Sequence, residues 1–372
     1  MNIAFFSESY KPYLSGVTNS IETLKKGLED LGNKVMVFSP DYPGAPQMPD
    51  AYRFPSIPAP YPGYRLSIPI PGRYFGELKK AGVNVIHSHS PYQLGLLSMH
   101  YARKLKIPFV FTMHTILGKY MHYVPLIPNK VLDFFSSGYI KGFCNRCDRV
   151  VVPTEKIKQQ LSSIGITAKM DVVPTGIDLS LFDASSSVGV RQKHGIPDGA
   201  KLLLFVGRLA REKNLEFLLK AFEEILSKHN NAYLLLAAGG PMEKELKEKA
   251  PKNVVFAGEV SYPKVLDYYA ASDVFVFSSL SETQGLVLAE AMASGLPQVA
   301  LDAEGVSDVV RNGITGYLTL PSVDAFSVKV LSLLEDHALW SLMSKASKDV
   351  ARSAYSKEVF ARKIELIYKS VI

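Results

Sequence analysis

The chain has 372 residues, 47% of them hydrophobic, and this length favours two globular domains over a single core. No stretch approaches the roughly 20 apolar residues that span a bilayer, and the first residues contain no basic and apolar leader, so we expect a soluble, cytoplasmic protein. Two cysteines, Cys144 and Cys147, are too few for a structural zinc site, and we expect free thiols.

The net charge of +7 arises entirely from the first half of the chain. Residues 1–185 contain 20 Lys and Arg against 13 Asp and Glu, whereas residues 186–372 contain 22 of each kind. The basic clusters are Arg73, Lys79, Lys80, Arg103, Lys104, Lys106, Lys141, Arg146 and Arg149. Such a face attracts nucleic acid, an anionic membrane or an anionic soluble substrate, unless it is simply a solvated surface. No DNA-binding or RNA-binding motif accompanies it, so we do not expect nucleic acid as a partner.

Short apolar runs alternate with helical patterns along the first half. Strands are predicted at 3–6, 35–38, 84–87, 108–111 and 150–153. A helix is predicted from about Val17 to Leu31, where apolar residues recur at helical spacing. Residues 40–73 are rich in proline and aromatic residues without a regular period, so we expect an irregular excursion there. The alternation predicts a doubly wound parallel α/β sheet.

A second set of apolar runs follows a polar stretch that contains three consecutive serines at 185–187. Strands are predicted at 202–206, 233–236, 254–256, 274–277 and 298–300. These runs predict a second Rossmann-like sheet and a cleft between the two sheets. The expected domains are a first Rossmann-like domain at 1–180, a linker at 181–200, a second Rossmann-like domain at 201–350 and a C-terminal helix at 351–372.

The segment 281–297 places two carboxylates, Glu282 and Glu290, eight residues apart across a glycine turn that opens a helix. A predicted strand precedes it, so the turn should lie at the carboxyl edge of a parallel sheet, where open α/β folds bind ligands. Free N–H groups near Gly285 and Leu286 suit a diphosphate, while Glu282 could bind sugar hydroxyls and Glu290 ribose hydroxyls. Alternatively, both are ordinary acidic residues of a helix, with Glu290 on a solvated face.

Two cations, Arg208 and Lys213, follow another predicted strand and would also lie at a carboxyl edge. The Arg208 guanidinium can bind phosphate oxygens and Lys213 adds a point charge, so together they would offset the charge of a departing nucleotide diphosphate. Pairing with Glu212 or Glu216 on the surface is the alternative. No Asp-x-Asp pair is present, so we expect no metal ion, and no G-x-G-x-x-G fingerprint supports a dehydrogenase.

Residues of the first half also follow predicted strands. Gly16, between the first strand and the first helix, would allow a close backbone approach to a ligand, although such a glycine is often structural. His114 should point into the cleft, although a lone histidine is usually structural. His87 and His89 lie after another strand, but no further zinc ligands stand at a compatible spacing.

The Glu282-x7-Glu290 pair and the Gly207-Arg208-x4-Lys213 segment resemble motifs of retaining GT-B glycosyltransferases of family four, and the resemblance covers nearly the whole chain. It implies two Rossmann-like domains facing a central cleft, with a C-terminal helix that crosses back to the first domain. The implied residues that bind a nucleotide-sugar donor are Gly16, Arg208, Lys213, Glu282, Thr283, Gln284, Gly285, Leu286 and Glu290. The implied catalytic residues are His114, Arg208, Lys213 and Glu282, without a protein nucleophile, a metal or a cofactor.

Within that family the chain looks most like bacterial diacylglycerol glucosyltransferases, on the segments 9–17 and 281–285. The segment 119–123 also resembles bacterial glycolipid synthases, although Leu117 stands where a tyrosine is expected. The resemblance implies UDP-glucose as donor and a lipid acceptor such as diacylglycerol. The implied acceptor-binding residues are Ser15, Tyr120, His122 and Tyr123.

A lipid acceptor and the basic first half together favour peripheral docking at the anionic inner face of a membrane. We expect Tyr74, Phe75 and Leu78 to insert beside the basic residues there as an interfacial helix. Related mannosyltransferases share the segment 16–20 and use GDP-mannose, so that donor and a soluble sugar acceptor stay open. A nucleotide-sugar-binding protein without catalysis is the alternative from another class.

Overall fold

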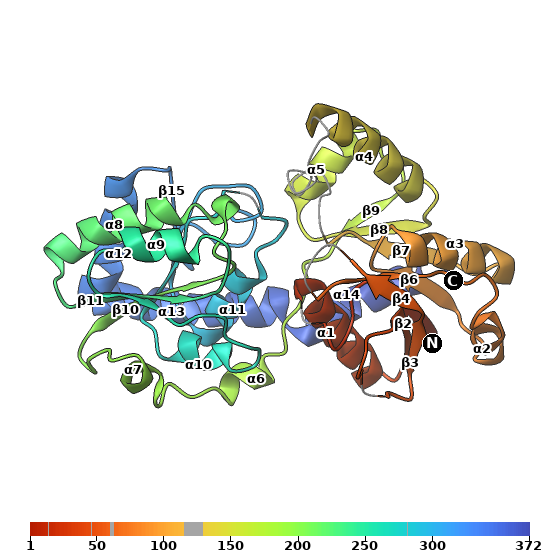
Figure 1. Ribbon diagram of the computed structural model, residues 1–372, viewed down its shortest axis with the longest axis horizontal. Coiled ribbons are helices and arrows are strands. Elements are labelled where there is room, and N and C mark those ends of the chain that lie inside the picture. The colour runs from red at the N-terminus through yellow and green to blue at the C-terminus, as the bar shows by residue number, and fades with distance from the viewer. Residues whose placement is uncertain (14, 46, 60–62, 115–128, 281) are drawn as a thin grey trace. The chain divides into compact units, whose positions relative to one another are not determined.

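The computed structural model describes residues 1–372 except 14, 46, 60–62, 115–128 and 281 (Figure 1). The chain forms two compact units. The first contains Met1–Gly176 together with Lys357–Ile372, and the second contains Ile177–Ser356. Each unit is built on a parallel sheet, which confirms the predicted α/β fold class.

The first unit contains a seven-stranded sheet in the order β3-β2-β1-β6-β7-β8-β9. Its strands are β1 (Asn2–Phe6), β2 (Lys34–Pro40), β3 (Ala51–Phe54), β6 (Val85–Ser88), β7 (Phe109–Thr112), β8 (Arg149–Val152) and β9 (Met170–Val172). Side chains alternate between the faces of a strand, so Ile3 and Phe5 enter one buried apolar cluster and Ala4 and Phe6 enter another. Both faces are therefore covered, as the continuous apolar runs predict.

Helices pack on this sheet (Figure 1). They are α1 (Gly16–Asp30), α2 (Phe75–Lys80), α3 (Gln93–Leu105), α4 (Asn129–Cys144), α5 (Glu155–Ser163) and α14 (Lys357–Lys369). Helix α14 packs along α1 so closely that a Cβ on Gly27 would lie 2.7 Å from the Cβ of Ala361. The predicted return of the C-terminal helix to the first unit is confirmed. Cys144 and Cys147 are buried free thiols.

The prediction of an irregular excursion at 40–73 is wrong in part. Strand β3 adds an edge strand parallel to β2, and β4 (Ser56–Pro58) pairs with β5 (Arg65–Ser67) as an antiparallel hairpin. These strands are only three or four residues long and prolines flank them, so no apolar period develops in the sequence. Helix α2 buries Leu78 completely against the core, so the expected insertion of Leu78 into a membrane is wrong. Tyr74 and Phe75 are partly buried against the same core.

The second unit contains a six-stranded sheet in the order β12-β11-β10-β13-β14-β15. Its strands are β10 (Lys201–Val206), β11 (Ala232–Ala237), β12 (Val254–Phe256), β13 (Val274–Phe277), β14 (Gln298–Leu301) and β15 (Gly316–Thr319). Its helices are α6 (Ser180–Asp183), α7 (Val190–Lys193), α8 (Leu215–Lys228), α9 (Glu243–Lys249), α10 (Val265–Ala270), α11 (Leu286–Ser294), α12 (Val323–Glu335) and α13 (His337–Val350). The expected linker 181–200 contributes Phe182, Val190 and Ile196 to the buried core of this unit.

Candidate active site

In each sheet the strand order reverses at one position. The reversal lies between β1 and β6 in the first unit and between β10 and β13 in the second. In open α/β sheets, ligands bind outside the carboxyl ends of the strands at such a reversal. The loops there are 7–15 and 89–92 in the first unit, and 207–214 and 278–285 in the second. They carry several of the predicted site residues, namely Ser15 in the first unit and Arg208, Lys213 and 282–285 in the second, so the fold gives each unit one candidate ligand site.

In the second unit, Lys213 and Glu282 form an ion pair across the reversal, although they lie 69 positions apart in the chain. The Lys213 ammonium also lies 5.8 Å from the centre of the Phe277 ring. The two charged side chains are only 16% and 13% exposed, so each depends on the other for stabilisation. Lys213 therefore pairs with a predicted donor-site residue, rather than with Glu212 or Glu216 as in the surface alternative.

Two neighbouring loops fix the backbone around this pair. The Ser278 hydroxyl donates to the Lys213 carbonyl at 2.7 Å, and the Glu282 N–H donates to the Glu304 carbonyl at 3.1 Å. Gly305 has a φ of +75°, and a Cβ there would lie 2.3 Å from the Glu282 carbonyl oxygen. Glycine at this position therefore allows the loop after β14 to support Glu282.

The predicted glycine turn is present. Gly285 has a φ of +71°, which favours glycine, and helix α11 begins at Leu286. Thr283 is half-buried, Gln284 is buried, and Leu286 packs against the core. The N-terminal end of α11 follows Glu282 by a few residues, and its N–H groups and dipole favour an anion there.

Glu290 lies on α11 and accepts a hydrogen bond of 2.8 Å from the Tyr269 hydroxyl. Burial raises the pKa of Glu290, and the hydrogen bond from Tyr269 opposes this effect. Tyr269 is completely buried on α10, so it holds one carboxylate oxygen in place. Glu290 is therefore not the solvated helix residue of the alternative reading. The other predicted cation, Arg208, is exposed on the loop after β10.

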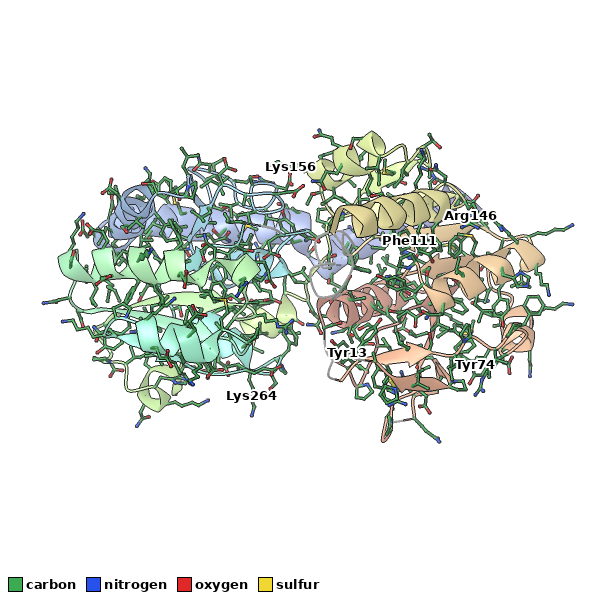
Figure 2. The ribbon with its side chains drawn as sticks, turned by 45° about the horizontal axis from the view of Figure 1, so that its top comes forward. Tyr13, Tyr74, Phe111, Arg146, Lys156 and Lys264 are labelled. Atoms are coloured by element: carbon green, nitrogen blue, oxygen red, sulfur yellow. The ribbon has the colours of Figure 1, made fainter. Side chains whose placement is uncertain are left out.

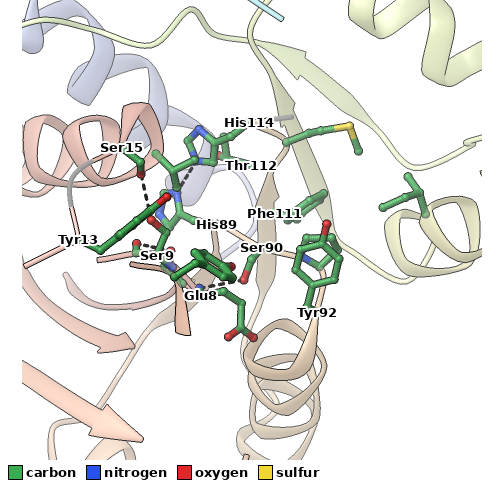
Figure 3. Close-up of a pocket in the computed structure, with 16 residues that line it drawn as sticks. Glu8, Ser9, Tyr13, Ser15, His89, Ser90, Tyr92, Phe111, Thr112 and His114 are labelled. Carbon is green, nitrogen blue, oxygen red and sulfur yellow. Dashed lines mark hydrogen bonds between the residues drawn. The ribbon is translucent and has the colours of Figure 1, made fainter. Parts of the chain in front are cut away.

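The first unit has a cavity of about 250 Å³ at its own reversal (Figure 3). Tyr13, Tyr64, Tyr92 and Met113 line it with aromatic and apolar groups. Its polar lining includes Ser9, Ser15, Ser90, Thr112, His89 and His114. Apolar walls with a few convergent polar groups are typical of sites that bind small molecules or parts of larger amphiphiles.

Three histidines stack beside this cavity. The ring centres of His87 and His89 are 4.3 Å apart, and those of His89 and His114 are 5.3 Å apart. His87 is hydrogen-bonded through both nitrogens, to the hydroxyls of Tyr368 and Thr112. Burial lowers the pKa of His87 to about 3 and that of His114 to about 4, and it holds the pKa of His89 well below its usual value. All three rings are therefore neutral near pH 7.

Ser15 and Gly16 form the start of α1. The Ser15 hydroxyl accepts a hydrogen bond of 3.1 Å from the Thr18 N–H and thereby caps the helix. It also lies 2.9 Å from the Ser9 hydroxyl, so it joins the cavity lining to the helix start. Gly16 is the first helical residue and lies in the chain between Ser15 and Val17, which line the cavity.

Several residues that fix the conformation of these loops are not identifiable from the sequence. The buried carboxylate of Glu8 accepts a hydrogen bond of 2.7 Å from the Leu94 N–H and is bonded to the Ser67 hydroxyl. Tyr269 orients Glu290 through a hydrogen bond, and Gly305 leaves room for the backbone carbonyl of Glu282. Each acts on a partner distant in sequence, so no local spacing identifies it.

Three predicted acceptor residues, Tyr120, His122 and Tyr123, lie outside the described residues. In the part of the chain that the structure describes, no group of three or more His, Cys, Asp or Glu side chains is placed to hold a metal ion. Within the same residues, no helix is long and apolar enough to cross a membrane.

Comparisons with known proteins define the class. The model for Glycosyltransferase Family 4 matches residues 14–181, and the model for glycosyl transferases group 1 matches residues 189–355. Sucrose-phosphate synthase from Thermosynechococcus elongatus has the same fold, with a TM-score of 0.78 over 99% of this chain and 98% of that one at 22% identity. The chain belongs to the GT-B glycosyltransferases of family four. Each family model matches most of one unit, and one relative is similar over the whole chain.

Two similar relatives are alpha-monoglucosyldiacylglycerol synthases. The protein from Acholeplasma laidlawii is 30% identical over 100% of this chain and 98% of its own length. The protein from Streptococcus pneumoniae is 32% identical over 86% of this chain and 75% of its own length. A GDP-mannose-dependent alpha-mannosyltransferase from Mycolicibacterium smegmatis is 30% identical over 88% of this chain and 86% of its own length. The relatives thus share the glycosyltransferase class and differ in the sugar that their names give.

Proposed function

We propose that this protein is a retaining, metal-independent hexosyltransferase that moves glucose from UDP-glucose to a lipid hydroxyl such as that of diacylglycerol. The observation that carries the proposal is the Lys213–Glu282 pair at the strand-order reversal of the second unit. The two monoglucosyldiacylglycerol synthases support glucose and diacylglycerol as the transferred sugar and the acceptor. UDP as the nucleotide rests on the resemblance of the segments 9–17 and 281–285.

Donor binding in this proposal replaces the Lys213–Glu282 pair by two new interactions. A donor phosphate pairs with the Lys213 ammonium and also binds Arg208 and the N–H groups at the start of α11. The Glu282 carboxylate, no longer paired with Lys213, accepts hydrogen bonds from sugar hydroxyls. Glu290 accepts from the ribose hydroxyls, oriented by Tyr269. Because these charges are held in place before the bond breaks, they stabilise the departing diphosphate electrostatically.

The acceptor hydroxyl in this proposal attacks the anomeric carbon from the face that the diphosphate leaves. His114 is neutral, so it contacts the transferred sugar as a hydrogen-bonding group and not as a charged acid. The departing phosphate oxygen accepts the proton of the acceptor hydroxyl, and no protein nucleophile takes part. Catalysis consists of positioning and electrostatic stabilisation.

Product analysis with a matrix of donors and acceptors tests this function. The purified protein would be incubated with UDP-glucose or GDP-mannose, and with diacylglycerol in mixed micelles or a soluble sugar. We expect an α-linked glucolipid from UDP-glucose and diacylglycerol, identified by mass spectrometry and by the NMR coupling constant of the anomeric proton. A β-linked product would contradict the retaining mechanism.

The mannosyltransferase relative favours GDP-mannose as a second candidate donor. A mannosylated product from GDP-mannose, with no product from UDP-glucose, would replace the proposed donor. Binding of UDP-glucose by calorimetry without any product would instead favour the nucleotide-sugar-binding protein. A glucosylated soluble sugar would replace the lipid acceptor.

Transfer is expected to continue in the presence of EDTA. Two cations and a helix start can neutralise the diphosphate in place of a metal ion. The measurement is the initial rate with and without EDTA, followed by addition of Mg²⁺ or Mn²⁺. Complete loss of activity on chelation, restored by the added ion, would overturn the metal-independent mechanism.

Peripheral attachment at the cytoplasmic face of an anionic membrane is expected to depend on the basic residues of the first unit. Arg73, Lys79 and Lys80 are exposed. Ile70, whose carbonyl accepts a hydrogen bond of 3.2 Å from the Arg73 N–H, is 38% exposed, so it supplies apolar contact in place of the buried Leu78. Reversing the three basic residues to Glu should weaken sedimentation with anionic vesicles, without abolishing transfer to a short-chain acceptor.

A matched charge reversal in the second unit provides the control. Lys244, Lys252 and Lys264 are also exposed, and the Lys264 side chain points outward in Figure 2. Their reversal to Glu changes the net charge equally and should leave vesicle binding intact. Binding to anionic vesicles should also decrease as salt rises, since the attraction decays over a Debye length of about 8–10 Å. Equal binding to neutral and anionic vesicles, or none to either, would contradict this docking.

A further inference from the structure

His89 and His114 are joined by one hydrogen bond inside the cavity of the first unit (Figure 3). Nδ1 of His89 lies 3.0 Å from Nε2 of His114, so one of these nitrogens carries a proton and the other accepts it. In a neutral imidazole only one ring nitrogen is protonated. The direction of this single bond therefore fixes the tautomer of both rings.

The second nitrogen of His89 indicates the direction. His89 Nε2 is buried and has no hydrogen-bond partner among the described residues. A buried N–H without a hydrogen-bond partner is rarer than a buried acceptor without one. We therefore infer that Nε2 is the unprotonated ring nitrogen of His89. The proton of His89 then resides on Nδ1 and is donated to Nε2 of His114.

The surroundings of His89 hold its ring in this orientation. The Phe5 ring contacts it edge-on at 4.8 Å between ring centres, and the His87 ring stacks on it at 4.3 Å; Phe5 also contacts the His87 ring edge-on. His87 in turn is fixed at both nitrogens by Tyr368 and Thr112. The donor of the His89–His114 bond therefore sits on a rigid support.

We propose that His89 is a positioning residue that holds His114 in the tautomer with its proton on Nδ1. His114 then presents an N–H donor at Nδ1, because its Nε2 is occupied by His89. In the proposed transferase this donor is the group that meets an oxygen of the transferred sugar, and this part rests on the proposed function. Burial lowers the pKa of both rings, which keeps the pair neutral.

The tautomer can be measured without substrate by NMR of protein labelled with ¹⁵N-histidine. Protonated and bare ring nitrogens give well separated resonances, and the His89→Asn and His114→Asn variants assign them. We expect a protonated Nδ1 and a bare Nε2 at His114. A protonated Nε2 at His114 would overturn the proposal. This result does not depend on any enzymatic activity, so it stands apart from a failure of the proposed function.

Kinetics of two variants test the positioning role. His89→Phe keeps a flat ring but removes the donor, and it should lower kcat about tenfold, the scale of one hydrogen bond, with the KM for UDP-glucose little changed. His89→Asn places an amide N–H near the Nδ1 position and should restore most of kcat. His100→Phe, at an exposed position on α3, is the control and should not change kcat. Unchanged kcat in His89→Phe, or equal loss in His89→Asn, would contradict the role of the hydrogen bond.

Discussion

Replacing Lys213 with alanine is expected to lower kcat by about 10²–10³-fold, because the departing diphosphate loses a preorganised cation. The same change leaves Glu282 without its ion-pair partner in a largely buried position. Arg208→Ala is expected to act in the same direction. The measurement is steady-state kinetics with UDP-glucose, alongside circular dichroism to show that the fold is intact.

The control is Lys247→Ala. Lys247 also forms an ion pair, with Glu243, but its side chain is 52% exposed on the helix α9. A solvated pair of this kind contributes little, so turnover should stay normal. Near-normal turnover in both Lys213→Ala and Arg208→Ala would contradict the assignment of the donor site.

Gly305→Ala is expected to lower kcat/KM about 10²-fold, because a displacement of about 1 Å at a reacting group has effects of this size. The new Cβ would lie 2.3 Å from the Glu282 carbonyl oxygen and 2.7 Å from its carbonyl carbon, so one of the two loops must move. Glu282 would then lose its position relative to Lys213. Kinetics with UDP-glucose and a thermal melt measure the two effects separately.

Gly313→Ala is a matched control for the backbone conformation. Gly313 has a φ of +76°, close to the +75° of Gly305, but a Cβ there meets nothing within 4 Å among the described residues. Gly313→Ala should therefore lower the free energy of unfolding by about 1 kcal/mol, because alanine is strained in the left-handed conformation, and it should leave kcat/KM unchanged. Equal kinetic defects in the two variants would show that strain, and not displacement of Glu282, is responsible.

Local patterns predicted the parts of the fold that depend on neighbouring residues. The strand that contains Ile3 and Phe5 is recognisable because a strand buried on both faces is apolar throughout. The turn at Gly285 is recognisable because a left-handed residue at the start of a helix favours glycine. The short strands β3, β4 and β5 are held by pairing with partners elsewhere in the fold, and they leave no period in the sequence.

The same limit applies to the candidate site. Lys213 and Glu282 were predicted from two separate motifs, and their contact appears only when β10 and β13 become neighbours in the sheet. The bond from Tyr269 to Glu290 and that between His89 and His114 join different elements, at positions 21 and 25 apart in the chain. The sequence motifs therefore predict which residues bind a ligand. The residues that orient these side chains become apparent only in the folded structure.

The return of α14 to the first unit constrains the order in which this protein can be made. Phe360, Ile364 and Tyr368 complete the buried cluster that covers one face of the first sheet, and Tyr368 also anchors His87. These residues leave the ribosome only after the whole of 177–356. During synthesis the second unit can fold as a continuous segment, whereas the first keeps an apolar face that α1 covers only in part until α14 emerges. A fragment that ends at Gly176 would keep that face exposed permanently, and with it an unsupported histidine stack.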